Sequence, residues 1–180
     1  MNSSRSLSPD KAAQNWILLG IPVLSIAGCL MHFVYEWSGN LTAVGIFSPV
    51  NESVWEHLKL TFWPMLIWWI SGYYLLNKRG KISAAQWFSS CTAAELVCPM
   101  VIVSFFYSYT GALGIESLIL DIFSLFLGII AAQSFSLHLY KNAEFGNYCL
   151  YISITTLALL AAAFTIFTFT PPQLPLFMDS

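Results

Sequence analysis

The stretch WILLGIPVLSIAGCLMHFVYEW, residues 16–37, is long and apolar enough to form a helix that crosses a lipid bilayer. A spanning helix needs about 20 mostly apolar residues, and the only formally charged residue here, Glu36, lies next to the end. The stretch is too long for the core of a signal peptide, and no small-residue cleavage site follows it. We therefore expect it to be retained as the first span.

The composition indicates the same class of protein for the whole chain. Of the 180 residues, 57% are hydrophobic and only 9% are charged, whereas a soluble domain carries about 25% charged residues. Only a membrane protein fits this composition, with the lipid bilayer as its first partner. The net charge of −2 gives no basic patch, which argues against nucleic acid as a partner.

Further stretches of spanning length follow at 58–77, 84–109, 115–140 and 148–170. We see no internal repeat and no second domain. The sequence thus predicts an all-α integral membrane protein with five transmembrane helices in a single domain, 16–170. Tails at 1–15 and 171–180 flank it, and a short helical entry segment is expected before the second span.

The basic residues predict the orientation of this bundle. Only Lys59 falls on one side of a five-span arrangement, and the remaining six fall on the other: Arg5, Lys11, Lys78, Arg79, Lys81 and Lys141. Basic loops stay in the cytoplasm, so the N-terminus is expected inside and the C-terminus outside. The eight tyrosines lie at span ends, as in an interfacial aromatic belt.

Ionisable side chains in the spans are candidates for function. A charge at the centre of a spanning helix costs about 2.5–3.5 kcal/mol on insertion scales, so such a residue usually has a partner or a role. The candidates lie in the outer half of the spans, at the midplane or in the outer loops, and we predict that they line one outward-facing polar cavity. They are the ionisable residues His32, Glu36, Glu52, Glu56, His57, Glu95 and Asp121, together with the polar residue Asn51.

The first candidates are His32 and Glu36, which are four residues apart and therefore neighbours on one helical face. Such a pair could join two helices. It could equally form part of a metal or proton site.

The segment FSPVNESVWEHLKL, residues 47–60, enters the second span. On a helix, Glu52 and Glu56 share a face, and His57 lies about 100° away. One helix therefore cannot direct all three side chains at a single ion.

The same segment also has a purely structural interpretation. Ser53-x-x-Glu56 matches a capping box, which starts a helix. An alternative start has Ser48 as the cap and Pro49 at the first helical position. Glu56 can pair with Lys59 at the i,i+3 spacing. We expect the segment to start the second span, and also to line the mouth of the cavity.

Glu95 lies midway along the third span and precedes Pro99, which removes a helix hydrogen bond and frees a carbonyl near residue 95. A kinked helix with a buried acid fits an ion pathway, and it also fits a neutral structural glutamate.

Asp121 heads a stripe of small residues with the spacing of close helix packing, which directs it into the bundle. The stripe is Ser124, Gly128, Ala132 and Ser136. Glu116 points almost the opposite way on a helix and is expected at the membrane surface.

Three stretches, HFVYEWSGN, FSPVNESVWEHLKL and YTGALGIESLILD, carry a resemblance that covers most of the chain. They resemble an uncharacterised family of small bacterial polytopic membrane proteins, catalogued as a domain of unknown function. The resemblance implies a multi-pass protein of the bacterial inner (plasma) membrane. It implies no reaction, ligand or catalytic residue.

Three functions remain open from the sequence. The first is binding or transport of a cation, a proton or a cationic solute, and a transporter this small without an inverted repeat would need to form a homo-oligomer. The second is a membrane-embedded, metal-dependent hydrolase acting on a lipid or small amphiphile. The third is a structural or accessory protein whose polar residues cap, pair and pack.

The hydrolase hypothesis assigns roles to particular residues. A divalent ion would be held by His32, Glu36 and His57, with Glu52 or Glu56 completing the set. Asp121 or Glu95 would then serve as the base.

Overall fold

The computed structural model describes residues 11–77 and 82–178, and every regular element in these ranges is helical. The predicted all-α class is therefore confirmed. The elements are α1 (Lys11–Trp37), α2 (Thr42–Gly45), α3 (Val54–Leu76), α4 (Ala84–Leu113), α5 (Leu118–Asn142), α6 (Asn147–Phe169) and the short 3-10 helix η1 (Pro175–Phe177).

Each of the five predicted stretches coincides with one long helix. Four of these helices, α1, α4, α5 and α6, are long and apolar enough to cross a membrane. The remaining one, α3, begins at Val54, so the entry segment expected before the second span is its first turn. That turn carries Glu56, and Lys59 follows shortly after it. Four of the basic residues behind the predicted orientation lie outside the described residues: Arg5, Lys78, Arg79 and Lys81.

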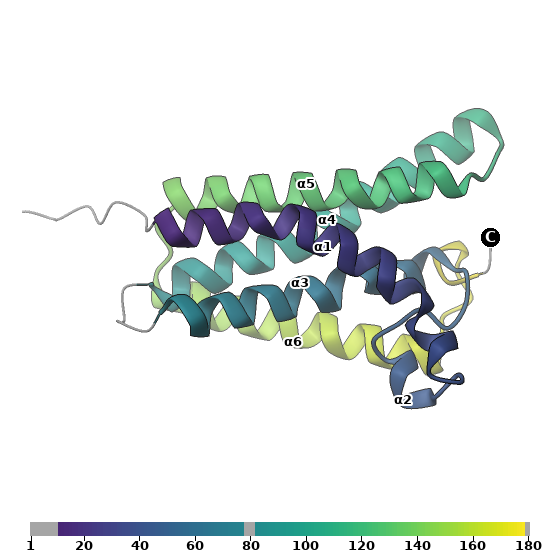
Figure 1. Ribbon diagram of the computed structural model, residues 1–180, viewed down its shortest axis with the longest axis horizontal. Coiled ribbons are helices and arrows are strands. Elements are labelled where there is room, and N and C mark those ends of the chain that lie inside the picture. Colours follow the sequence, from purple (N-terminus) through teal and green to yellow (C-terminus); the bar gives the residue numbers. More distant parts are fainter. Residues whose placement is uncertain (1–10, 78–81, 179–180) are drawn as a thin grey trace, which may run out of the picture.

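The long helices lie roughly side by side along one axis (Figure 1). The most extensive contact is between α4 and α5, and α1 contacts both α3 and α5. The α4–α5 turn and α2 lie at the same end of the bundle, on the right in Figure 1. The start of α1 and the end of α5 lie at the opposite end.

Glycines allow these helices to approach closely. A Cβ atom at Gly128 of α5 would lie 2.8 Å from Ile102 Cγ1 and 3.1 Å from the Cys98 carbonyl oxygen of α4. A Cβ atom at Gly28 of α1 would lie 3.1 Å from the Leu60 carbonyl oxygen of α3. The predicted small-residue stripe on α5 is buried along its whole length.

Candidate metal centre

The start of α3 is fixed by hydrogen bonds of the segment before it. Ser53 is the N-cap, and its hydroxyl oxygen accepts from the Glu56 backbone N–H at 3.3 Å, as the capping box predicts. In a full capping box the Glu56 side chain would also accept from the Ser53 N–H, and here two other hydrogen bonds replace that one. The Ser53 N–H donates to Asn51 Oδ1 at 3.1 Å, while one Glu56 carboxylate oxygen accepts from the Val50 N–H at 3.0 Å.

Because α3 begins at Val54, Glu52 lies outside the helix and does not follow helical periodicity. Its Oε2 atom lies 3.3 Å from His57 Nε2 and 3.9 Å from His32 Nε2. The two Nε2 atoms are themselves 3.3 Å apart. Glu52 and His57 therefore converge, because Glu52 precedes the helix on which the sequence argument placed it. Glu56 is not part of this group, so the three side chains do not meet at one point, as that argument expected.

The orientation of His57 is set by the same N-cap residue. His57 Nδ1 lies 3.0 Å from the Ser53 carbonyl oxygen, which can only accept a hydrogen bond. We therefore assign the ring hydrogen to Nδ1, which leaves a lone pair on Nε2. A histidine held in this way through its second nitrogen is typical of metal ligands.

The separations of the three ligand atoms suit a tetrahedral ion. Zinc bonds of about 2.0–2.1 Å place tetrahedral ligand atoms about 3.3 Å from one another. Two of the three separations have this value, and the third is 3.9 Å. The side chains of His32, His57 and Glu52 are 32%, 29% and 67% exposed, so an ion can reach them from outside the bundle.

A buried ion pair holds the segment that carries Glu52. Lys59 Nζ donates to Glu56 Oε2 at 2.6 Å and to the Gly45 carbonyl oxygen at 2.7 Å, and both charged side chains are buried. The i,i+3 pair expected from the sequence is confirmed. The Thr168 hydroxyl of α6 donates to the second oxygen of Glu56 at 3.4 Å. The pair thus ties the α2 region, α3 and α6 together.

Two further bonds attach this segment to its neighbours. The Ser48 hydroxyl donates to the Met31 carbonyl oxygen at 2.5 Å, directly before His32 in α1. The Trp63 indole N–H of α3 donates to the Ile46 carbonyl oxygen at 2.9 Å. These contacts fix the position of the loop, and therefore of Glu52, relative to His32.

The three residues open onto a cavity of about 290 Å³. Two further acids, Glu116 and Asp121, also line this cavity. Apolar side chains from α3, α4 and α5 form most of the remainder: Leu60, Ile102, Phe106, Leu118, Ile122 and Leu125.

Asp121 is held in place by Tyr109. The tyrosine hydroxyl donates to Asp121 Oδ1 at 2.6 Å and accepts from the Ser117 N–H at 3.4 Å. Glu116 is exposed and lines the cavity, whereas the sequence argument placed it on the opposite face at the membrane surface. Since α5 begins at Leu118, Glu116 precedes the helix, and the helical-face argument does not apply to it.

Comparison with known protein families finds a match. The model of a family of unknown function, DUF6512, matches residues 5–180. The chain belongs to the DUF6512 family. The predicted membership of an uncharacterised family is therefore confirmed. No curated protein and no solved structure matches the chain.

Four residues predicted for the polar cavity do not line it in this DUF6512 chain: Glu36, Asn51, Glu56 and Glu95. Asn51 accepts from the Ser53 N–H, and Glu56 pairs with Lys59. Glu36 is exposed on α1 and is not in the group formed by the two histidines and Glu52. Glu95 is buried in α4 and does not line the cavity. Its Oε1 atom has no hydrogen-bond partner among the described residues.

Sequence reasoning missed Glu116 and Tyr109 as parts of the cavity region. The signal for Glu116 is that α5 starts after Ser117. Glu116 therefore precedes the helix, and helical periodicity does not determine where its side chain points. The sequence carries no comparable signal for Tyr109, because its bond to Asp121 depends on how the α4–α5 turn folds.

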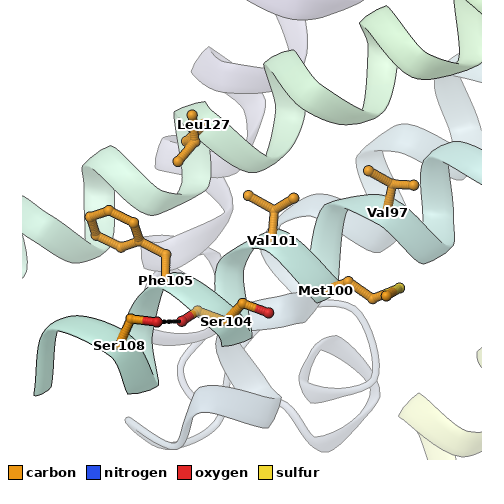
Figure 2. Close-up of a pocket in the computed structure, with 7 residues that line it drawn as sticks. All are labelled: Val97, Met100, Val101, Ser104, Phe105, Ser108 and Leu127. Carbon is orange, nitrogen blue, oxygen red and sulfur yellow. Dashed lines mark hydrogen bonds between the residues drawn. The ribbon is translucent and has the colours of Figure 1, made fainter. Parts of the chain in front are cut away.

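A second hollow of about 440 Å³ lies on the surface of α4 and α5 in this DUF6512 chain (Figure 2). Its walls are mainly apolar and include Val101, Phe105 and Leu127. The Ser108 hydroxyl donates to the Ser104 carbonyl oxygen at 2.6 Å, within α4 itself. The described residues that line this hollow include no acid, base or histidine, so it offers no metal ligands.

Proposed function

We propose that this protein is a multi-pass membrane protein that binds a divalent transition-metal ion through His32, Glu52 and His57. The observation that supports the proposal is the convergence of one ligand atom from each residue, all within 4.8 Å of one another. Imidazole nitrogen and carboxylate oxygen are both ligands of zinc, and three protein ligands leave a fourth position open.

The proposal includes five spans, with the N-terminus in the cytoplasm and the site at the outer face of the bacterial inner membrane. Two features support α3 as the remaining span. It has 23 residues, as many as α6, and it packs along α1 and α4. The positive-inside rule supports the orientation. Lys11 begins α1 and Lys141 lies in the last turn of α5, and both helix ends lie at the opposite end of the bundle from α2.

Ion binding explains the geometry better than a structural role does. A hydrogen bond between two imidazoles would be enough to join α1 to α3. The structure adds a third ligand atom from Glu52, a fixed ring hydrogen on His57 and an adjoining cavity. These features are the ones that an ion with an open coordination position requires.

Titration of the purified protein with zinc, in competition with a chromophoric chelator, tests this proposal. We expect one zinc ion per chain, with a dissociation constant of about 1 μM or lower. Protons compete with the ion for the imidazole nitrogens, so lowering the pH from about 7.5 to 5.5 should weaken binding at least tenfold. Binding that does not saturate at one ion, or that does not change with pH, would argue against the site.

A second candidate function is hydrolysis, which the open coordination position beside an apolar cavity favours. Held by His32, Glu52 and His57, a zinc ion would supply the activation of water for ester hydrolysis, which yields a carboxylic acid and an alcohol. The test is cleavage of short- and long-chain p-nitrophenyl esters by the zinc-loaded protein, with His57→Ala as the inactive variant. If zinc binds and no zinc-dependent cleavage of either ester is observed, ion binding remains the function and hydrolysis is excluded for this ester class.

A further inference from the structure

We infer that the cavity beside the candidate metal centre binds a single-chain amphiphile with a cationic head group. The inference rests on the proposed function, because it names the molecule that would occupy the same cavity. Three observations carry it: the charges of the lining residues, the size of the cavity and the exposure of its rim.

The charges of the cavity are of one sign. Glu52, Glu116 and Asp121 line it, and none of the described lining residues is a lysine or an arginine. The nearby Lys59 is buried and paired with Glu56, so it does not offset these charges. A bound divalent ion would offset two of the three carboxylate charges. In the metal-free protein the lining therefore favours a cation over an anion.

The volume limits what the cavity can hold. Ligand cavities typically measure about 300–1,000 Å³, and this one measures about 290 Å³. It can take a head group and the first part of one apolar chain, but not a whole two-chain lipid. The rest of the chain must leave the cavity.

The apolar wall provides a route for that chain. Leu60, Ile102 and Leu125 are buried and form the inner part of the wall. Leu118 and Ile122, at the start of α5, are 68% and 40% exposed. An apolar surface thus continues from the inside of the cavity to the outside of the bundle, where the bilayer would cover it.

The carboxylates at the start of α5, Glu116 and Asp121, would position the cationic head group. Asp121 is held by the Tyr109 hydroxyl, and Phe106 lies beside Tyr109 with a ring separation of 5.6 Å. Phe106 and Asp121 both line the cavity, so a cation bound there would have an aromatic ring and a carboxylate among its neighbours. An anionic head group would instead face carboxylates of the same sign, so the charges of the lining residues also disfavour anionic amphiphiles.

A scintillation proximity assay with tritiated dodecyltrimethylammonium, on the full-length protein in a non-ionic detergent, tests the inference. We expect saturable binding that unlabelled dodecyltrimethylammonium displaces and laurate, at the same concentration, does not. Removing both wall charges in Asp121→Asn/Glu116→Gln should weaken binding at least tenfold, since charge-assisted contacts are lost. Glu144→Gln, which removes an exposed acid outside the cavity, is the matched control and should bind as the wild type does.

Zinc titration of the same wild-type sample separates the two proposals. If the wild type binds zinc but shows no saturable dodecyltrimethylammonium binding, the inference fails and the metal site stands. Equal displacement by laurate, or unchanged binding in the double variant, also overturns the inference, because charge would then not select the ligand. If neither zinc nor the amphiphile binds, both proposals fail.

Discussion

Replacing Lys59 with methionine is expected to lower the free energy of unfolding by about 3–5 kcal/mol. Lys59 donates to Glu56 and to the Gly45 carbonyl oxygen, and it is fully buried. Methionine has a similar length and keeps much of the packing. It leaves the Glu56 carboxylate buried without a cation, and it leaves the Gly45 oxygen without this donor. An uncompensated buried charge is the main reason for the large effect.

Reversible unfolding in mixed detergent micelles measures this change. Lys141→Met is the matched control, because Lys141 is exposed at the end of α5 and should tolerate the change within about 0.5 kcal/mol. The double variant Glu56→Gln/Lys59→Met should recover part of the loss, because it contains no unpaired buried charge. A loss below about 1 kcal/mol for Lys59→Met alone would show that the ion pair does not hold this segment in place.

Replacing either His32 or His57 with alanine is expected to weaken zinc binding at least about 100-fold, because each change removes one of the three proposed ligands. His32 and His57 each provide an Nε2 atom to the cluster. The chain offers His138→Ala as a matched control, since His138 is exposed on α5 and interacts with Asn142. That variant should bind zinc with the affinity of the wild type.

Two further variants test which carboxylates take part in zinc binding. Glu36→Gln and Glu95→Gln should keep full zinc affinity, because neither residue belongs to the histidine–carboxylate cluster. All variants are compared in the same competition titration with a chromophoric chelator. Equal losses in His57→Ala and His138→Ala would mean that zinc binds by surface histidines in general and not at this centre.

The positions of the long helices could be predicted from the sequence because an apolar stretch of spanning length is a property of consecutive residues. The predicted stretch 84–109 and the observed helix Ala84–Leu113 begin at the same residue. The N-cap at Ser53 was predictable for the same reason, since a cap depends on residues three positions apart. Asp121 was directed into the bundle correctly by the small residues that follow it.

The candidate site was harder to predict because helical periodicity applies only inside a helix. Glu52 and Glu116 each directly precede the N-cap residue of a helix, where the backbone is extended and the side chain is free of the helical face. Glu36 illustrates the opposite difficulty. It does share a helical face with His32, but its side chain is exposed, and the sequence contains no signal for where the third ligand comes from.

The zinc K-edge X-ray absorption spectrum of the protein, loaded with one equivalent of zinc, tests the central claim most directly. The account predicts nitrogen and oxygen ligands at about 2.0–2.1 Å, with outer-shell scattering from two imidazole rings. Scattering from sulfur at about 2.3 Å would place the ion at cysteines, and a spectrum without imidazole scattering would place it on other ligands. Either result would contradict a metal centre formed by His32, Glu52 and His57.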